Sequence, residues 1–546
     1  MKKLTFLLVL LLAISANTYS QKLENQLDAL MVKQYRPDGP GAVALVVKDG
    51  KILYRKAFGM ANLELDVEMK PESVFRIGSI TKQFTAVAIL KLRDQGKLSL
   101  DDELTKYIKD YPTDGNTVTI KHLLTHTSGV KSYTSMPEFD VDIRKKDFAP
   151  LDFINFFKDQ PLDFKPGEEW RYSNSGYFIL GYIIEVASGM KYEEYITKTF
   201  FETLGMTSSY YGSPNRIIKN RTNGYGKRNG NLINTDYLSM TTPYAAGALL
   251  STVDDLYKWS KAIMDNEIVS ETSKEEAHST YVLNNGEKTG YGYGWSIGNI
   301  QGSQLISHGG GINGFLTSSM FLPEEKVFVA ILGNSDFKFP GQIARKMAAI
   351  AIGKPYDWNS IPVAEDKLKS YEAVYEAKKD KQLIITFKKG KLFALRTGGS
   401  KQEIVPYATN KFFFVNNKTE TLHFSTGTNE AITSVTSKST DYDVNWLRTE
   451  KPIPTIKKIE VDPKIAETYL GRYALAPTFF LSIFQEQDKM YLQATGQGKV
   501  EIVPFEENKF NLVDIDAKLT FNKDESGKIV SLTLHQNGNH EAKKLE

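Results

Sequence analysis

The stretch RIGSITKQFTA places a serine hydroxyl three residues before a lysine amine, at Ser79 and Lys82. Apolar residues such as Phe84 and Leu90 follow at helical spacing, which predicts a helix that begins near Ser79 and ends near residue 96. Side chains three residues apart on a helix lie on one face. The neutral amine of Lys82 could then take the proton of the Ser79 hydroxyl, so the pair predicts a nucleophile and its base.

A helix cap is the alternative role for Ser79, because serine is a preferred N-terminal residue of helices. A lysine in the first turn faces the positive end of the helix dipole, which disfavours the ammonium and favours the neutral amine. Lys82 therefore favours the catalytic interpretation. The same spacing recurs at Ser128 and Lys131, but Gly129 and the lack of an apolar stripe predict a turn there.

A tyrosine and an asparagine precede a nearly all-apolar helical stretch in PGEEWRYSNSGYF. The phenol of Tyr172, near a charged Lys82, is expected to have a lowered pKa and to pass a proton to a leaving group. The amide of Asn174 offers a donor and an acceptor that could orient substrate and lysine. The structural alternative is that Asn174 or Ser175 caps the helix while Tyr172 packs beneath it.

The stretch ISHGGGINGF ends an apolar strand at His308 and continues with the three bare glycines at 309–311. Backbone N–H groups of such a strand, together with the N–H of Ser79, could stabilise an oxyanion. A tight strand connection is the alternative.

The elements that must position these residues suggest an α/β fold, of the α+β type. Residues 43–47 and 52–54 flank Asp49-Gly50 and predict a hairpin. Helical patterns prevail from 79 to 264, and strand patterns return near 304, including a second hairpin around Pro323. We therefore expect one antiparallel sheet, built from both ends of a domain at 21–355, with a helical region between them.

The C-terminal part repeats itself at a constant offset of 98 residues: EIVPYATNKF at 403–412 matches EIVPFEENKF at 501–510, and Tyr371 matches Tyr469. Short alternating stretches predict two small all-β barrel-like domains, at 361–450 and 460–546, joined by a proline-containing linker at 451–459. Three roles stay open for them: a stabilising or spacing module, partial closure of the active-site cleft, or binding of an apolar ligand by aromatic residues, namely Phe412, Phe413 and Phe414.

The first 20 residues have two lysines followed by an apolar run too short to span a membrane, and they read as a cleaved signal peptide. We expect a periplasmic or secreted protein with no stable membrane span. The chain has no cysteine, which excludes thiol catalysis and cysteine-zinc sites. Its net charge of +3, from 68 basic and 65 acidic residues, argues against nucleic acid as a partner. The oligomeric state stays open.

The motifs SITK, YSN and HGG, in this order, resemble those of the serine β-lactamase and penicillin-recognising hydrolase family, specifically its class C, D-stereospecific peptidase and esterase branch. The flanking stretches HLLTHTSGV, YAAGALLSTVDDLYKW and YGYGWSI are also similar, over roughly 25–355. The C-terminal repeats resemble lipocalin-like modules of some members. The resemblance implies no metal or other cofactor. It implies that Ser79 is the acylated nucleophile, Lys82 its base, Tyr172 the acid/base phenol and Asn174 the amide that orients the substrate. It also implies that His308 to Gly311, Gly310 included, form the strand beside the substrate and that Gly311 is the second oxyanion donor.

One departure from the family concerns its third motif. Efficient β-lactamases carry Lys-Thr-Gly, whereas this chain has His308-Gly309-Gly310. A histidine of ordinary pKa is mostly neutral at pH 7 and attracts a β-lactam carboxylate less than lysine does. We expect a peptidase, carboxypeptidase or esterase acting on small-molecule or peptide substrates, with a β-lactamase proper or a penicillin-binding sensor without turnover as alternatives.

A metal hydrolase is the remaining class to weigh, because His122 and His126 stand one helical turn apart in HLLTH. Leu123 stands where a His-Glu-x-x-His metalloprotease has its glutamate, so the motif is incomplete. We expect these histidines to cap or pack the loop that follows.

Overall fold

The computed structural model describes residues 21–545 except 229, 378–380, 429, 440–442 and 477–478. The predicted signal peptide at 1–20 lies outside the described residues. Within them, no helix is long and apolar enough to cross a membrane. The chain divides into two compact units, one holding a sheet with its helices and one holding the C-terminal strands.

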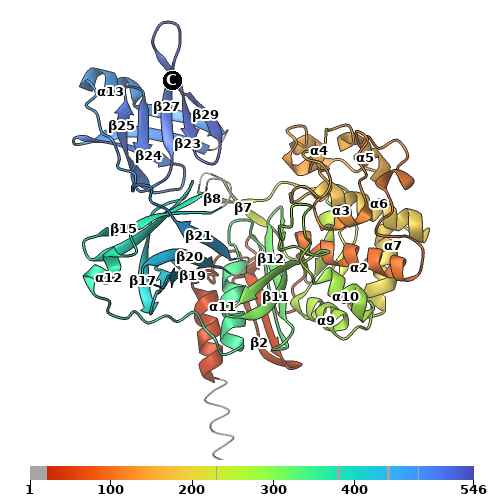
Figure 1. Ribbon diagram of the computed structural model, residues 1–546. Coiled ribbons are helices and arrows are strands. Elements are labelled where there is room, and N and C mark those ends of the chain that lie inside the picture. Colours follow the sequence, from red (N-terminus) through yellow and green to blue (C-terminus); the bar gives the residue numbers. More distant parts are fainter. Residues whose placement is uncertain are drawn as a thin grey trace, which may run out of the picture. The chain divides into compact units, whose positions relative to one another are not determined.

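A six-stranded antiparallel sheet organises the first unit, with strands in the order β10-β11-β12-β13-β1-β2 (Figure 1). Strand β1 pairs with β13, so Ala42 lies opposite Gly333 and distant parts of the chain meet, as predicted. The hairpin of β1 and β2 turns at Asp49 and Gly50, both in the left-handed conformation, as their types predict. The strands are β1 (Ala42–Lys48), β2 (Lys51–Phe58), β10 (Ser296–Ile300), β11 (Ser303–Ile312), β12 (Phe315–Leu322) and β13 (Val327–Gly333).

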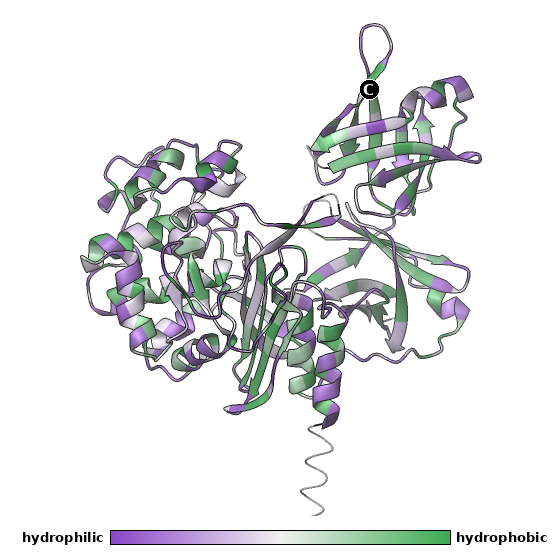
Figure 2. Ribbon diagram, turned by 180° about the vertical axis from the view of Figure 1, so that it is seen from behind, coloured by the Kyte–Doolittle hydropathy of each residue, from purple (hydrophilic) through white to green (hydrophobic). Residues whose placement is uncertain are grey.

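Strands β1 and β13 are buried on both faces. Residues of β1 and β13 alternate between the faces, and Val43, Leu45 and Phe328 belong to the core shared with the helical region. Helix α9 (Val253–Met264) and helix α11 (Gly341–Ala351) both contact these strands. Both strands consist almost entirely of buried residues, which suits a sheet covered on both faces; Figure 2 shows hydrophobic colouring in the sheet of the first unit.

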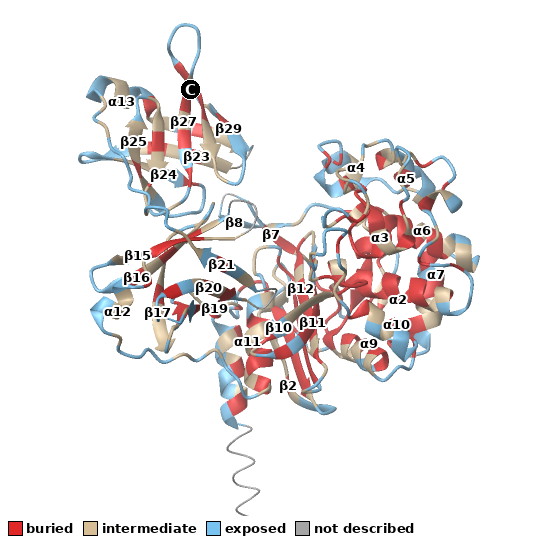
Figure 3. Ribbon diagram, in the orientation of Figure 1, coloured by how far each residue is buried: buried red, intermediate tan, exposed pale blue. Residues whose placement is uncertain are grey.

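Helix α2 (Thr81–Asp94) and helix α6 (Asn174–Ser188) form the centre of the helical region. Both are buried over most of their length (Figure 3), which agrees with the nearly all-round apolar sequence of α6. Gly181 lets α6 approach α8 (Tyr244–Gly247), because a Cβ there would lie 2.4 Å from that of Ala245. The other helices here are α3 (Ile120–Leu124), α4 (Val141–Lys145), α5 (Pro150–Phe157), α7 (Tyr192–Ile196) and α10 (Glu271–Ala277).

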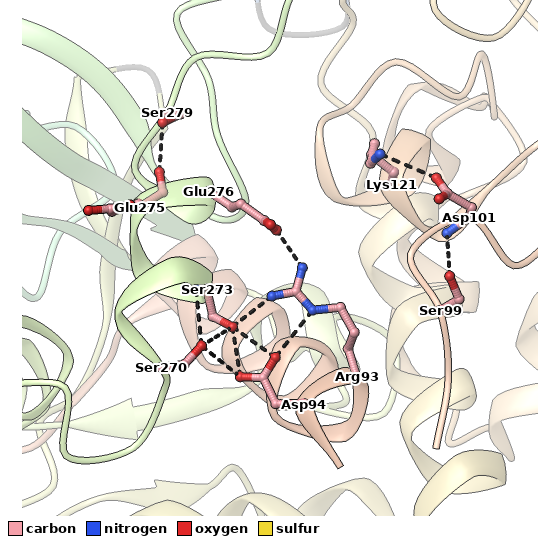
Figure 4. Close-up of polar contacts among 10 residues, drawn as sticks. All are labelled: Arg93, Asp94, Ser99, Asp101, Lys121, Ser270, Ser273, Glu275, Glu276 and Ser279. Atoms are coloured by element: carbon pink, nitrogen blue, oxygen red, sulfur yellow. Dashed lines mark hydrogen bonds and ion pairs between the residues drawn. The ribbon is translucent and has the colours of Figure 1, made fainter. Parts of the chain in front are cut away.

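A polar network fixes the C-terminal end of α2 to α10 (Figure 4). The guanidinium of Arg93 pairs with Glu276 and donates to the Ser273 hydroxyl at 2.7 Å. Ser273 in turn donates to Asp94 at 2.7 Å. These contacts hold the far end of the helix whose first turn carries Lys82.

Each C-terminal repeat is a closed eight-stranded antiparallel barrel, as predicted. Corresponding contacts recur at the offset of 98 residues: the Tyr375 hydroxyl donates to the Tyr371 carbonyl at 2.8 Å, and Tyr473 donates to Tyr469 at 2.7 Å. The first barrel comprises β14 (Ala373–Glu376), β15 (Gln382–Lys388), β16 (Lys391–Arg396), β17 (Gln402–Ala408), β18 (Lys411–Phe414), β19 (Asn417–Thr426), β20 (Ile432–Lys438) and β21 (Val444–Arg448). The second comprises β22 (Gly471–Ala476), β23 (Phe479–Glu486), β24 (Lys489–Ala494), β25 (Lys499–Glu506), β26 (Lys509–Leu512), β27 (Lys518–Lys523), β28 (Ile529–His535) and β29 (Asn539–Lys544).

The aromatic run of the first barrel is part of its packing. Phe412 and Phe414 belong to the core cluster, and the Phe412 ring lies 4.9 Å from the Tyr371 ring. This favours the stabilising role over an apolar ligand site for these two side chains.

Candidate active site

Ser79 lies in a single 3-10 turn, η1 (Gly78–Ile80), immediately before α2. Neither η1 nor α2 has a side-chain cap hydrogen bond at its start. The helix-cap alternative for Ser79 is therefore wrong, and the serine hydroxyl is left for other chemistry. Ser128 lies in a loop, as predicted, and its hydroxyl accepts a hydrogen bond from the N–H of Val130 at 3.2 Å.

The amine of Lys82 is enclosed by three oxygen atoms. Its Nζ lies 3.3 Å from the Ser79 Oγ, 2.8 Å from the Asn174 Oδ1 and 2.8 Å from the Ala246 carbonyl. A neutral amine has two N–H groups, which the amide oxygen and the carbonyl accept. Its lone pair then remains for the Ser79 hydroxyl, which can donate to it.

Burial decides the charge of this lysine. Lys82 is 0% exposed, and no carboxylate pairs with it among the described residues. Desolvation therefore lowers the pKa of Lys82 well below its ordinary value of 10.5. The shift favours the neutral amine, which is the form that is able to act as a base.

Asn174 begins α6, but it does not cap it. The hydroxyl of Ser173 accepts from the Gly176 N–H at 3.3 Å and is the cap, so the alternative that assigned the cap to Asn174 or Ser175 is wrong. The Asn174 amide bridges two partners: its oxygen accepts from Lys82, and its nitrogen donates to the Thr134 hydroxyl at 3.1 Å.

Tyr172 lies beside the pair, with its ring centroid 4.7 Å from the Lys82 Nζ. Its hydroxyl is buried without a hydrogen bond to any described residue. Burial raises the pKa of this phenol, and the neighbouring Ser79 side chain only partly opposes the shift. The expected lowering of the Tyr172 pKa is therefore wrong, because it assumed a charged lysine that burial disfavours. The phenol keeps its proton and can donate it.

His308 lies inside β11, and its two ring nitrogens are both in contact with protein groups. Its Nδ1 lies 2.6 Å from the Gly309 carbonyl, so it carries the proton that it donates there. Its Nε2 lies 3.0 Å from the Tyr291 hydroxyl, which donates to it. Burial lowers the pKa of His308 to about 4, and the proximity of Lys82 adds to this shift. The imidazole is neutral, as its type predicts at pH 7, and it offers no free donor to a substrate.

The glycines after His308 allow β11 to approach the nucleophile. A Cβ on Gly310 would lie 2.0 Å from the carbonyl oxygen of Ile77, and a Cβ on Gly78 would lie 2.9 Å from the nitrogen of Gly311. Gly78 also has a positive φ of 52°, a conformation that favours glycine. Strand β11 and the turn that carries Ser79 are thus in direct backbone contact.

A cavity of about 260 Å³ opens at Ser79. Of the predicted site residues, Ser79, Asn174 and Gly311 line it, whereas Lys82, Tyr172, His308 and Gly310 are not among the lining residues. The other lining residues are Tyr133, Thr134, Phe139, Arg144, Leu238, Thr242, Pro243, Ala246, Gly247, Ile312 and Asn313.

Three supporting groups were not predicted from the sequence: the carbonyl of Ala246, the hydroxyl of Thr134 and the hydroxyl of Tyr291. The stretches YAAGALL and YGYGWSI contain Ala246 and Tyr291, but the sequence indicated only that these stretches resemble the corresponding parts of the family. Every residue has a backbone carbonyl, so the sequence cannot indicate which one contacts Lys82; the structure identifies it as that of Ala246.

The two histidines of HLLTH have local structural roles. The His122 Nδ1 accepts from the Thr119 N–H at 3.3 Å in a capping box, and the His126 Nδ1 accepts from the Ser173 N–H at 3.1 Å. Among the described residues, no group of three metal-ligating side chains of the His, Cys, Asp and Glu types is present. His126 packs beneath Tyr172, with ring centroids 4.2 Å apart.

Comparison with known proteins shows which sequences and folds this chain is similar to. The sequence model of the Beta-lactamase family matches residues 22–353, and that of a Domain of unknown function (DUF3471) matches residues 455–545. Penicillin-binding protein 4* of Bacillus subtilis (strain 168) is 30% identical over 394 residues, which cover 68% of this chain and 86% of the relative.

Solved structures share the fold. The octameric penicillin-binding protein homologue from Pyrococcus abyssi has a TM-score of 0.54 at 30% identity and covers 78% of this chain and 99% of its own. D-amino acid amidase from Ochrobactrum anthropi SV3 has a TM-score of 0.53 at 22% identity, covering 61% and 99%, a likeness of fold alone. Since the family's model spans more than half of the sequence and a relative of 30% identity is largely covered, the chain belongs to the Beta-lactamase family.

Proposed function

We propose that this protein is an exported serine hydrolase that cleaves amide or ester bonds through an acyl-enzyme on Ser79. The observation that carries the proposal is the contact of 3.3 Å between the Ser79 hydroxyl and a fully buried Lys82 amine that pairs with no carboxylate of the described residues. A hydroxyl becomes a useful nucleophile when a neutral base accepts its proton.

The first half of the reaction is acyl transfer. The Ser79 oxygen attacks the substrate carbonyl while its proton moves to Lys82, and the carbonyl oxygen becomes an oxyanion. The N–H groups of Ser79 and Gly311 are the expected donors to it, since both residues line the cavity and their backbones adjoin. The protonated Tyr172 phenol donates to the leaving group and is reprotonated by Lys82, so that the C–N or C–O bond breaks with the proton balanced.

The second half is hydrolysis of the ester on Ser79. Water attacks the acyl carbonyl, Lys82 again accepts a proton, and the proton returns to Ser79 as the serine leaves. Asn174 holds the Lys82 amine toward Ser79 throughout, because its oxygen accepts one of the two N–H groups.

The substrate class that we propose is D-amino-acid peptides, wall-derived peptides or small esters. The neutral His308 supports this choice, because it provides no positive charge where efficient β-lactamases have a lysine. Two similar proteins are named as a penicillin-binding protein and a penicillin-binding protein homologue, which supports a site that accepts penicillin-like amides. They also favour a second candidate, a penicillin-binding protein that is acylated but does not turn over.

Hydrolysis of a substrate panel by the mature protein tests the proposal. The panel contains a chromogenic cephalosporin, D-amino-acid amides, D-Ala-D-Ala peptides and short-chain nitrophenyl esters. We expect turnover of a peptide, amide or ester that Ser79→Ala abolishes and the control Ser128→Ala retains. Turnover that survives in Ser79→Ala would refute the serine mechanism, whereas a stable penicillin adduct without turnover would select the second candidate.

A further inference from the structure

The Tyr172 phenol belongs to an irregular segment of the chain. The structure describes all of residues 169–173, which form neither helix nor strand and connect the turn at 166–168 to the start of α6. The proposed mechanism requires the Tyr172 hydroxyl to stay beside Ser79, because a proton donor acts only within hydrogen-bond reach of its acceptor. Contacts from outside the segment must therefore hold the phenol in place.

One residue, His126, holds the backbone on both sides of Tyr172. Its carbonyl accepts from the Arg171 N–H at 3.0 Å, and its ring Nδ1 accepts from the Ser173 N–H at 3.1 Å. The imidazole also packs against the phenol ring, with centroids 4.2 Å apart and planes inclined by 38°. The same residue thus fixes the N–H group before Tyr172, the N–H group after it and the ring between them.

The protonation state of His126 suits this role. Burial lowers the pKa of His126 well below 6.5, and the proximity of Lys82 adds to the shift. The neutral imidazole is therefore favoured, and since Nδ1 accepts from Ser173, its proton lies on Nε2. An imidazolium would lose the acceptor and would place a second positive charge near Lys82.

Two local costs show that packing alone does not account for a histidine here. The Nε2–H of His126 is buried without a hydrogen bond to any described residue, which costs free energy. Its backbone has a positive φ of 60°, which non-glycine residues seldom adopt. A phenylalanine ring would pack beneath Tyr172 without an unsatisfied N–H group, but it would leave the Ser173 N–H without its acceptor.

We propose that His126 is a positioning residue, which holds the Tyr172 phenol where it donates its proton to the leaving group. This inference rests on the proposed function and adds a residue to it. The proton passes from the phenol to the leaving oxygen or nitrogen as the bond to the acyl carbon breaks, and Lys82 then reprotonates the phenol. His126 exchanges no proton in this cycle and acts only through the position of Tyr172.

Two esters of one acid, 4-nitrophenyl butyrate and ethyl butyrate, test this role. They form the same acyl-enzyme but differ in the leaving group, because nitrophenolate leaves without a proton whereas ethoxide needs one. Loss of proton donation therefore lowers kcat/KM for the ethyl ester much more than for the nitrophenyl ester. The reference variant Tyr172→Phe should show this selective loss, of about 10²–10⁴-fold on the ethyl ester.

Two variants of His126 separate its hydrogen bond from its ring. His126→Phe keeps an aromatic ring and removes the Nδ1 acceptor, so we expect a loss of at least about tenfold on the ethyl ester and of no more than about threefold on the nitrophenyl ester. His126→Asn lacks the ring, but its side-chain oxygen can accept from the Ser173 N–H, and asparagine tolerates a positive φ. This variant should retain most of the wild-type ratio of the two kcat/KM values.

The matched control is His122→Phe, because the His122 Nδ1 also accepts a backbone N–H, that of Thr119, in the same motif. This control should keep the wild-type ratio. The double variant His126→Phe/Tyr172→Phe should lose no more on the ethyl ester than Tyr172→Phe alone, since His126 acts through Tyr172. Thermal unfolding verifies that each variant is folded.

Equal losses on the two esters in His126→Phe would overturn the inference, as would a selective loss in His126→Asn that His126→Phe does not show. If His126→Phe does not fold, His126→Asn decides, because a wild-type ratio supports the inference and a lost ratio overturns it. A wild type that cleaves only the nitrophenyl ester would also overturn it. Failure of the proposed function appears separately, as absence of turnover of both esters by the wild type.

Discussion

The oxygens around the Lys82 amine define its role at the scale of single residues. Two acceptors at 2.8 Å and the Ser79 hydroxyl at 3.3 Å surround it. The lysine with the same spacing, Lys131, lies in a loop and is only half-buried. Burial of the lysine therefore distinguishes the Ser79–Lys82 pair from the equally spaced Ser128–Lys131 pair.

Replacing the base should slow acylation strongly. We expect Lys82→Met to lower kcat/KM by roughly 10²–10⁴-fold, the usual contribution of a positioned proton acceptor. The matched control is Lys131→Met, which should stay within about twofold of the wild type. Initial rates on the best panel substrate measure both, with thermal unfolding to verify that each variant is folded. Equal losses in the two variants would exclude the proposed base.

The pH dependence of kcat/KM should report the charge of Lys82. Its lowered pKa means that activity rises with pH through a value well below 10.5, because the neutral amine is the active form. Asn174→Asp would place a carboxylate at the position 2.8 Å from Nζ, which favours the ammonium and raises the Lys82 pKa. We expect the rising limb of the profile to move to higher pH in this variant. A limb that stays in place or moves to lower pH would contradict the assignment.

Strand β11 and the turn η1 form the functional unit at the scale of elements. Gly310 and Gly309 are neighbours in this strand, but they differ in the space available to a side chain. A Cβ on Gly310 would lie 2.0 Å from the Ile77 carbonyl oxygen, whereas one on Gly309 would meet the Thr317 carbonyl oxygen at 3.6 Å, an ordinary contact.

Gly310→Ala should therefore displace the strand from the turn that carries Ser79. Misplacing one oxyanion donor costs about 10²–10³-fold in kcat, and we expect a loss of this size. Gly309→Ala is the matched control and should retain most of the activity. Steady-state kinetics on a nitrophenyl ester decides between them, and a fully active Gly310→Ala enzyme would show that the close approach is unnecessary.

The sequence predicted elements well where local patterns determine them. Asp49-Gly50 identified a hairpin, and the apolar, β-branched runs on either side of Pro323 identified another. The constant offset of 98 residues, as between Tyr371 and Tyr469, indicated two copies of one domain, and the short alternating stretches indicated barrels. The direction of the Tyr172 pKa was predicted wrongly, because it is set by the burial of the phenol itself, which distant segments bring about. The hydrogen bond between Tyr291 and His308 likewise depends on packing that a linear motif does not encode.

Acid sensitivity is a property of the first unit as a whole. Burial lowers the pKa of His308 from 6.5 to about 4 and that of His278 from 6.5 to about 3. The unfolded chain binds these protons first, so the stabilisation is complete above about pH 6.5 and is lost as the pH falls toward 4. For His308 alone the loss approaches about 3 kcal/mol over that range, at about 1.4 kcal/mol per pH unit.

Urea unfolding at several pH values measures this effect. The free energy of unfolding of the first unit should decrease steeply between pH 6.5 and 4.5. His308→Asn should reduce the slope by up to about 1.4 kcal/mol per pH unit, because one titrating group is removed. An unchanged slope in this variant would show that His308 does not couple folding to pH.

The central claim is that Ser79 carries the acyl group. The most direct test is mass spectrometry of the protein quenched in acid during turnover of an activated ester, followed by proteolysis. The account predicts an acyl adduct on the peptide that contains Ser79, present in the wild type and in Ser128→Ala and absent from Ser79→Ala. An adduct on another residue, or one that persists in Ser79→Ala, would contradict it.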